Sequence, residues 1–286
     1  MFLRTRIVIL AVLALTLVTA RSLAPPPPSV TGAFGRGPVI VLVHGLGSRA
    51  DYWLPTARVL ARDHRVVLVD LPGHGSSAMP EPFSLERATL ALDLALQRET
   101  REPVVLVGHS VGGLIAAAEA CDHPSRVRAL VLVETALRPQ IDGPERAAAL
   151  AALDRHYQGV VHDAYLAFGR DSVQGEALYR EVAVMDSAVI KSWIRLAFTA
   201  DLSERIARLS CPLLVVLAPR SWPEGERWPV TAAALGYAQA PRVRAVRLEG
   251  CGHFVMLDRP GTLARLIARF ADEPAIPPLA LAATAR

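Results

Sequence analysis

The chain has 286 residues, of which 52% are hydrophobic and 20% are charged. This length suits one sizeable α/β domain with an insertion and is too short for two large domains. The formal net charge is +4, but the basic residues are scattered among acidic ones, which argues against a nucleic-acid partner.

The N-terminal segment has the pattern of a targeting signal. Two arginines precede an apolar run over residues 7–18, and residues 18–20 fit the small-residue rule for cleavage. The run is shorter than the roughly 20 residues that a membrane span needs. We therefore expect residues 1–20 to be a signal peptide of a secreted or periplasmic protein. The alternative is an uncleaved N-terminal anchor, the only case in which we expect contact with a membrane. The proline-rich residues 21–36 are expected to form a linker.

Short apolar runs alternate with helical patterns along residues 37–271, which is typical of a mostly parallel sheet with helices on both faces. Most runs are nearly continuous in valine, leucine and isoleucine, as expected for strands that are buried on both faces. Arginines along the last run suit an edge strand. The expected strands are Pro38–Val43, Arg65–Asp70, Pro103–Val107, Val127–Val133, Pro212–Ala218 and Val243–Leu248.

The pattern changes between residues 135 and 210. No strand signal occurs there, and several amphipathic helical stretches follow one another. We interpret this region as an all-helical cap inserted after the fourth strand, and its aromatic side chains favour a small, apolar substrate. The Pro- and Ala-rich residues 272–286 are expected to form a disordered tail.

The most informative motif is Gly108-His109-Ser110-Val111-Gly112, which stands between an apolar strand and a helix. A G-x-S-x-G in that context is the pattern of a nucleophile elbow, a tight turn that lifts a serine hydroxyl above the edge of the sheet. The sequence therefore predicts Ser110 as a nucleophile. It also predicts the Val111 amide, at the helix N-terminus, as an oxyanion donor.

A nucleophilic serine needs a base, and His253 is the candidate because it lies on a glycine-flanked loop beyond the last strand. The carboxyl ends of parallel strands meet at one edge of a sheet, so this loop should reach the edge that carries Ser110. The second oxyanion donor should be the amide of Leu46, in the loop after the first strand. His109 is expected to point elsewhere.

Residues 37–271 resemble the α/β-hydrolase fold family, in the branch with a helical cap. The motifs that carry this resemblance are HGLG at residues 44–47, DLPGHGSS at 70–77, GHSVGG at 108–113 and GHF at 252–254. Together they are specific for the fold and poorly specific for the substrate. The resemblance implies a serine hydrolase that needs neither a metal nor an organic cofactor, and a mainly structural role for the turn at 70–77.

The chain departs from this family at the acidic member of the triad. The family usually has an aspartate a few residues after the strand Pro212–Ala218, and residues 219–228 contain none. Some members carry the acid after the preceding strand, where this chain has Glu134. We therefore predict Glu134 as the residue that orients the base. Glu224, Glu226 and the lack of any functional acid remain alternatives.

These residues favour hydrolysis of a carboxylic ester or a related acyl bond through a serine, a histidine and an acid. Epoxide hydrolases and haloalkane dehalogenases resemble the chain but need an aspartate where Ser110 stands. Hydrolysis of lactones, thioesters, amides or C–C bonds shares the same motifs, as does acyl transfer. The missing aspartate also leaves open a non-catalytic, hydrolase-like binding protein.

Overall fold

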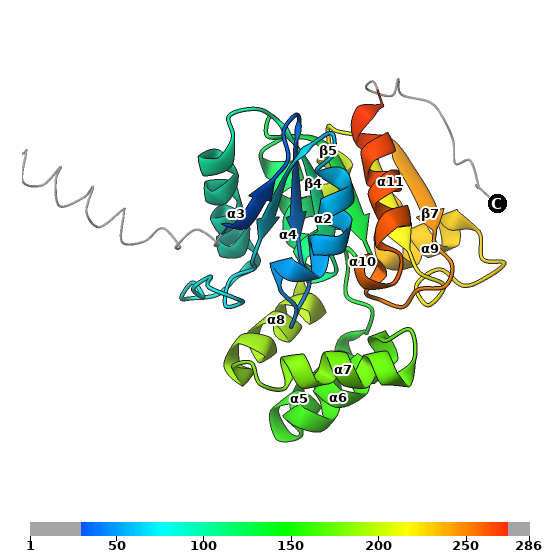
Figure 1. Ribbon diagram of the computed structural model, residues 1–286. Coiled ribbons are helices and arrows are strands. Elements are labelled where there is room, and N and C mark those ends of the chain that lie inside the picture. Colours follow the sequence, from blue (N-terminus) through cyan, green and yellow to red (C-terminus); the bar gives the residue numbers. More distant parts are fainter. Residues whose placement is uncertain (1–29, 274–286) are drawn as a thin grey trace, which may run out of the picture.

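The computed structural model describes residues 30–273, so the predicted signal peptide and nearly all of the predicted tail lie outside the described residues. Within residues 30–273, a seven-stranded sheet carries helices on both faces (Figure 1). Its strands are β1 (Val30–Phe34), β2 (Val39–Val43), β3 (Arg65–Val69), β4 (Val104–His109), β5 (Val127–Val133), β6 (Leu213–Leu217) and β7 (Val243–Arg247). The spatial order is β1-β3-β2-β4-β5-β6-β7, and every described pairing except β1 with β3 is parallel. The α/β fold that the sequence predicts is confirmed.

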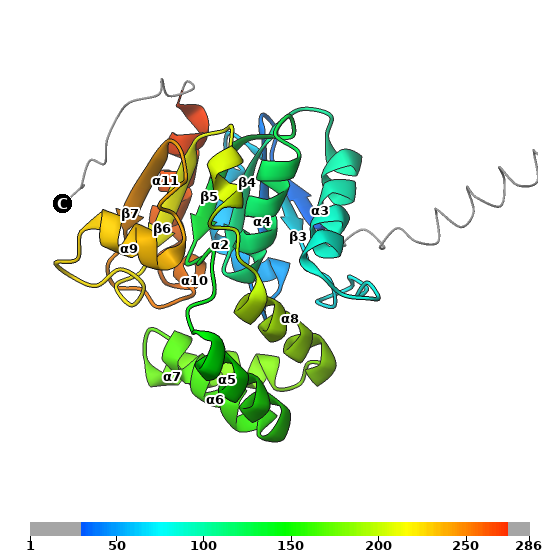
Figure 2. The ribbon, with the colours of Figure 1, turned by 180° about the vertical axis from the view of Figure 1, so that it is seen from behind.

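Helices cover both faces of the sheet, as the opposite views in Figures 1 and 2 show. One face carries η1 (Ala50–Trp53), α2 (Leu54–Leu60), α10 (Val255–Asp258) and α11 (Pro260–Asp272), and the other carries α3 (Leu85–Glu99), α4 (Val111–Asp122) and α9 (Trp228–Leu235). Alternate residues of β2 therefore enter different cores, with Val41 on the α3–α4 side and Leu42 on the α2–α11 side. Full burial of each such side chain contributes roughly 1.5–3 kcal/mol.

The strand β1 differs from the sequence-based expectation. We expected a linker through residue 36 and the folded domain from residue 37, yet Val30–Phe34 pairs antiparallel with β3. The strand gives a weak sequence signal because none of its five residues is fully buried and one is glycine. The sheet therefore begins at residue 30. At the other end, α11 runs one residue beyond the expected limit of residue 271.

In the described chain, the regular elements between β5 and β6 are all helices, and this is the interval that we interpreted as a cap. They are α5 (Gly143–Arg155), α6 (Tyr157–Phe168), α7 (Ser172–Val182), α8 (Ser187–Thr199) and the 3-10 helix η2 (Arg205–Arg208). Both views show α5 to α8 as a separate layer beyond one edge of the sheet. The apolar stripe of α8, formed by Ile190, Trp193 and Leu196, is buried. Within residues 30–273, no helix has the length and apolar character that a bilayer span requires.

The chain segments that enter and leave this helical layer are tied to each other and to the sheet domain. The Leu202 amide donates to the Leu137 carbonyl at 2.6 Å, and the Leu137 amide donates to the Leu235 carbonyl at 2.8 Å. The buried Tyr237 hydroxyl donates to the Thr135 carbonyl at 2.7 Å. The segment that enters the helical layer is therefore bonded both to the sheet domain and to the segment that leaves the layer.

Candidate active site

Ser110 occupies the turn between β4 and α4. Its φ of 53° and ψ of −126° lie outside the usual regions for residues with side chains. Such strain costs roughly 1–3 kcal/mol and is characteristic of functional sites. The turn is held by neighbours of β5, because the Ser110 amide donates to the Val133 carbonyl at 3.0 Å and the Thr135 hydroxyl donates to the Ser110 carbonyl at 3.2 Å. This is the strand-to-helix turn that the G-x-S-x-G pattern predicts.

The loop after β2, residues 44–49, packs directly against this turn and is called the β2 loop below. A Cβ added to Gly45 would lie 2.7 Å from His109 Nδ1 and 3.0 Å from Ser110 Cβ, and one added to Gly112 would overlap the His44 carbonyl oxygen. Glycine is required at both positions because the two segments touch there. The contact brings the β2 loop to the predicted nucleophile.

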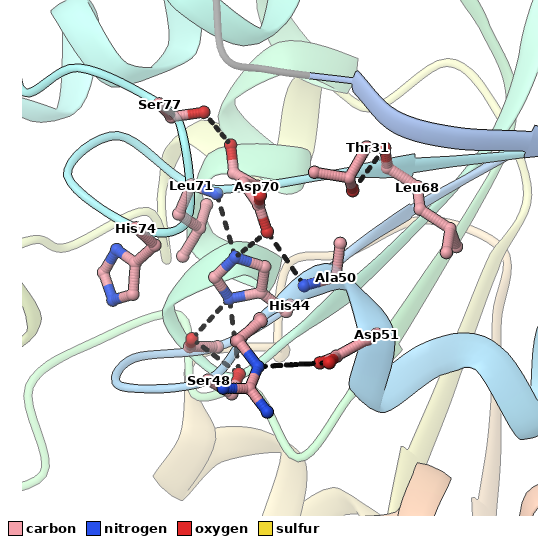
Figure 3. Close-up of polar contacts among 12 residues, drawn as sticks. Thr31, His44, Ser48, Ala50, Asp51, Leu68, Asp70, Leu71, His74 and Ser77 are labelled. Atoms are coloured by element: carbon pink, nitrogen blue, oxygen red, sulfur yellow. Dashed lines mark hydrogen bonds and ion pairs between the residues drawn. The ribbon is translucent and has the colours of Figure 1, made fainter. Parts of the chain in front are cut away.

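A buried network around His44 holds the β2 loop in place (Figure 3). His44 Nε2 accepts the Leu71 amide at 3.0 Å, and Nδ1 donates to the Gly45 carbonyl at 2.7 Å, which fixes the tautomer with its proton on Nδ1. The Asp70 carboxylate, beside the same ring, accepts the Ala50 amide at 2.9 Å. In this structure the turn at residues 70–77 supports the β2 loop.

The peptide between Leu46 and Gly47 is held at both of its polar atoms. His74 Nε2 accepts the Gly47 amide at 3.0 Å, and the Tyr165 hydroxyl of α6 donates to the Leu46 carbonyl at 2.7 Å. Burial, together with the neighbouring His44 ring, lowers the pKa of His74 to about 3. The His74 ring therefore stays neutral and can accept this bond.

The amides of Leu46 and Val111 are both available to a ligand. Val111 is the first residue of α4, where an amide has no acceptor inside the helix. Within residues 30–273, neither amide donates a hydrogen bond to the protein. Two unpaired N–H groups beside a strained serine can bind a negatively charged oxygen.

His253 and Glu134 form a hydrogen-bonded pair, with 3.0 Å between Nδ1 and Oε2. A carboxylate can only accept, so Nδ1 carries the proton, and Nε2, which forms no hydrogen bond within residues 30–273, is left as an acceptor. The pair lies beside the serine turn, because His109 Nε2 donates to the His253 carbonyl at 2.9 Å and the two rings are 4.7 Å apart. Burial and the nearby His253 hold the pKa of His109 well below its usual range, so His109 is a neutral donor.

Glu134 directly follows β5 and has a φ of 49°, which is uncommon for a residue with a side chain. Its side chain is fully buried. Oε1 accepts the Ala218 amide at 2.7 Å, and Oε2 accepts the Ser221 hydroxyl at 2.9 Å as well as the His253 ring. These bonds satisfy a carboxylate that would otherwise be costly to bury. Ser221 stands in the loop after β6, where the family that this chain resembles usually has an aspartate. In this chain the loop donates a hydrogen bond to Glu134 and supplies no carboxylate of its own to the histidine.

The alternative acids lie elsewhere. The Glu226 side chain hydrogen-bonds the Thr231 hydroxyl, and Glu224 is exposed to solvent. In the part of the chain that the structure describes, neither glutamate forms a hydrogen bond or an ion pair with His253. The structure therefore brings Glu134, and not Glu224 or Glu226, to the histidine.

Arg220 and Ser221 belong to this site, although the sequence analysis did not single them out. Arg220 Nη1 lies 3.5 Å from Glu134 Oε2 and 3.5 Å from His253 Nδ1. Because Nδ1 holds the proton that it shares with Glu134, the arginine contact is an ion pair with the carboxylate. The missing aspartate was a signal that could have led to Ser221, whereas nothing in the loop sequence distinguishes Arg220.

A cluster with metal-ligand character lies at the opposite end of α4. Asp93, Glu119 and His123 bring one ligand atom each to within 4.8 Å of one another. Asp93 is paired with Arg126 at 2.6 Å, and Glu119 is paired with His123 at 2.9 Å. Each of these groups has a protein partner, and the cluster lies far along α4 from Ser110.

Comparison with known proteins matches the chain to one family of hydrolases. A model of the alpha/beta hydrolase family matches residues 40–266. The pimeloyl-(acyl-carrier protein) methyl ester esterase of Yersinia enterocolitica is 29% identical over 260 residues, which cover 82% of this chain and 93% of the esterase. The enol-lactonase from Burkholderia xenovorans LB400 has a similar structure, with a TM-score of 0.72 and 23% identity over 86% of this chain and 100% of the lactonase. The hydrolase olei00960 from Oleispira antarctica also has a TM-score of 0.72, with 18% identity over 85% of this chain and 94% of that hydrolase. The family model covers most of the chain, including Ser110, Glu134 and His253. The chain is therefore a hydrolase that belongs to the alpha/beta hydrolase family.

Proposed function

We propose that this hydrolase cleaves a carboxylic ester or a related acyl bond, with Ser110 as nucleophile, His253 as base and Glu134 as the acid that orients the base. The observation that carries the proposal is the 3.0 Å bond between His253 and Glu134 beside a serine held at a φ of 53°. The name of the Yersinia relative, a methyl ester esterase, supports an ester as the substrate. The aromatic side chains of α6 beside the site, Tyr165 and Phe168, support an apolar one.

In the first half-reaction, the Ser110 oxygen attacks the carbonyl carbon while His253 Nε2 takes the hydroxyl proton. The carbonyl electron pair moves onto its oxygen, and the amides of Leu46 and Val111 donate to this oxyanion. Glu134 stays ionised and stabilises the imidazolium. When the intermediate collapses, His253 passes its proton to the leaving alcohol, and an acyl-enzyme remains.

In the second half-reaction, water attacks the acyl-enzyme while His253 Nε2 takes one of its protons. The same two amides bind the second oxyanion. Collapse of the intermediate breaks the bond to the Ser110 oxygen, which receives the proton back from His253. The products are the free acid and the starting enzyme, so protons move only among serine, histidine, alcohol and water.

A fluorophosphonate probe tests the proposal without knowledge of the substrate. We expect one adduct on the purified full chain, measured by intact mass, and no adduct on Ser110→Ala or His253→Ala. Wild-type protein that is folded by circular dichroism but not labelled would overturn the proposal and favour a binding protein. A panel of esters with different acyl lengths, with a lactone and a thioester beside them, would then define the substrate class.

A further inference from the structure

The last turn of α6 contacts both loops of the candidate site. Tyr165 and Phe168 are three residues apart and therefore lie on one side of the helix. The Tyr165 hydroxyl reaches the β2 loop through the Leu46 carbonyl. The Phe168 carbonyl accepts the His253 amide at 2.9 Å, and the Phe168 ring stacks on the His253 ring with an interplanar angle of 26°. One helical turn of the cap thus contacts both Leu46, whose amide is the proposed oxyanion donor, and His253, the proposed base.

The contacts of the β2 loop determine where the Leu46 amide points. That amide and the Gly45 carbonyl belong to one planar trans peptide, so they point in opposite directions. The carbonyl is held on its side by His44 Nδ1 at 2.7 Å and by the Ser48 hydroxyl at 2.9 Å. The N–H of Leu46 must therefore face the other way.

The next peptide plane, Leu46–Gly47, is fixed by its own pair of bonds to Tyr165 and His74. Tyr165 is almost fully buried, and burial raises the pKa of its hydroxyl, so the hydroxyl remains a donor. Without this bond, the Leu46 carbonyl would lose its partner, and the second plane would be held only by the bond from the Gly47 amide to His74. The angle between the two planes at Leu46 would then be less tightly fixed.

Asp258 links the loop that carries His253 to the same part of the cap. Its Oδ2 accepts the Gly252 amide at 2.8 Å, just before His253. Its Oδ1 accepts hydrogen bonds from the Arg170 guanidinium at 3.0 Å and from the Gln174 side-chain Nε2 at 2.6 Å, and both of these residues follow α6 in the chain. The position of α6 is therefore coupled to the position of His253.

We propose that the last turn of α6 is a positioning element for catalysis, with Tyr165 as the residue that holds the Leu46–Gly47 peptide and so steadies the Leu46 amide that His44 and Ser48 orient. The cap then does more than cover the site, because it completes the geometry in which the oxyanion is bound. This inference rests on the proposed function, since it assigns the Leu46 amide to the oxyanion.

The substitution Tyr165→Phe tests the proposal because it removes only the hydroxyl. The matched control is Tyr157→Phe on the same helix, whose hydroxyl is buried but has no hydrogen-bond partner within residues 30–273. Loss of one oxyanion donor typically costs about 100- to 1000-fold in kcat, and a misdirected donor should cost less. We expect Tyr165→Phe to lower kcat for an ester about tenfold with KM nearly unchanged, and Tyr157→Phe to change neither.

Hydrogen exchange separates a failure of this inference from a failure of the proposed function, because it needs no substrate. In Tyr165→Phe, peptides that contain residues 43–49 should exchange faster, while peptides from α11 should not. Unchanged exchange in residues 43–49, an unchanged kcat, or an equal loss of kcat in both variants would each overturn the inference. If the wild type has no esterase activity and labels with no fluorophosphonate, the proposed function fails. Exchange then still decides whether Tyr165 holds the loop.

Discussion

The Glu134 carboxylate is bonded on both oxygens, so its amide counterpart cannot replace it. In Glu134→Gln, an NH2 group would face the Ala218 amide in one orientation and His253 Nδ1–H with the Ser221 hydroxyl in the other. We expect kcat to fall by about 10³- to 10⁴-fold, because the histidine loses the partner that fixes its tautomer. Steady-state kinetics on the ester found in the panel would measure this.

The control for that substitution is Glu226→Gln, which alters a carboxylate bonded to Thr231 instead of to the histidine. Its kcat should stay close to that of the wild type. A large loss in Glu226→Gln together with a small loss in Glu134→Gln would transfer the role of the acid to the loop after β6.

Glu119 should make stability depend on pH. It is fully buried, its Oε1 has no hydrogen-bond partner in the described chain, and burial raises its pKa from 4.5 to about 7. The folded protein thus binds this proton more tightly than the unfolded chain does. The resulting destabilisation is absent below about pH 4.5, grows as the pH rises, and is complete above about pH 7.

Accordingly, Glu119→Gln should raise the free energy of unfolding by about 1–3 kcal/mol at pH 8 and by clearly less at pH 5. Urea unfolding of both proteins at the two pH values measures the difference. An effect of equal size at pH 5 and pH 8 would contradict the assignment of the shift to Glu119.

Single residues were predictable from the sequence where topology alone determines their position. Ser110, Glu134 and His253 each follow a parallel strand, and the ends of parallel strands converge on one edge whatever the loops do. Tyr165 was different, because its role depends on how α6 docks on the β2 loop. That docking is a tertiary contact across 119 residues of sequence, and the local sequence around Tyr165 contains no signal for it.

At the scale of elements, β1 protects the edge of the sheet. It pairs along Val66–Val69 of β3, which would otherwise present unpaired backbone groups and apolar side chains. A chain that begins at Ser29 keeps this strand, whereas one that begins at Gly35 lacks it. We expect the first to remain monodisperse in size-exclusion chromatography and the second to self-associate as its concentration rises. Equal behaviour of the two chains would show that β1 is dispensable.

The strands β2 to β6 were predictable because burial on both faces selects continuous apolar runs, which stand out in any sequence. The last predicted strand is an edge strand, as its arginines suggested. The same reasoning explains why β1 was missed, since an edge strand with exposed positions does not need an apolar run. Helices fill the interval predicted to be helical, but their exact ends depend on caps such as Asp142 and Asp171.

At the scale of the whole molecule, we propose that residues 1–20 direct export. Expression of the full chain in a bacterial host should yield periplasmic or extracellular protein whose intact mass corresponds to cleavage after Ala20. Full-length protein in the membrane fraction would instead support the N-terminal anchor. Full-length protein recovered only from the cytoplasm would contradict both.

The path of the backbone into the cap has a consequence for how the cap can move. The proposed acid, Glu134, is followed at once by Thr135, which is bonded to Ser110 and Tyr237, and then by the Leu137 contact that joins the two stems of the cap. Because these bonds hold residues 134–137 on the sheet domain, a cap that moved about a point beyond Leu137 would leave the acid beside its histidine. Alignment of the acid and any displacement of the helical layer therefore depend on different segments of the chain.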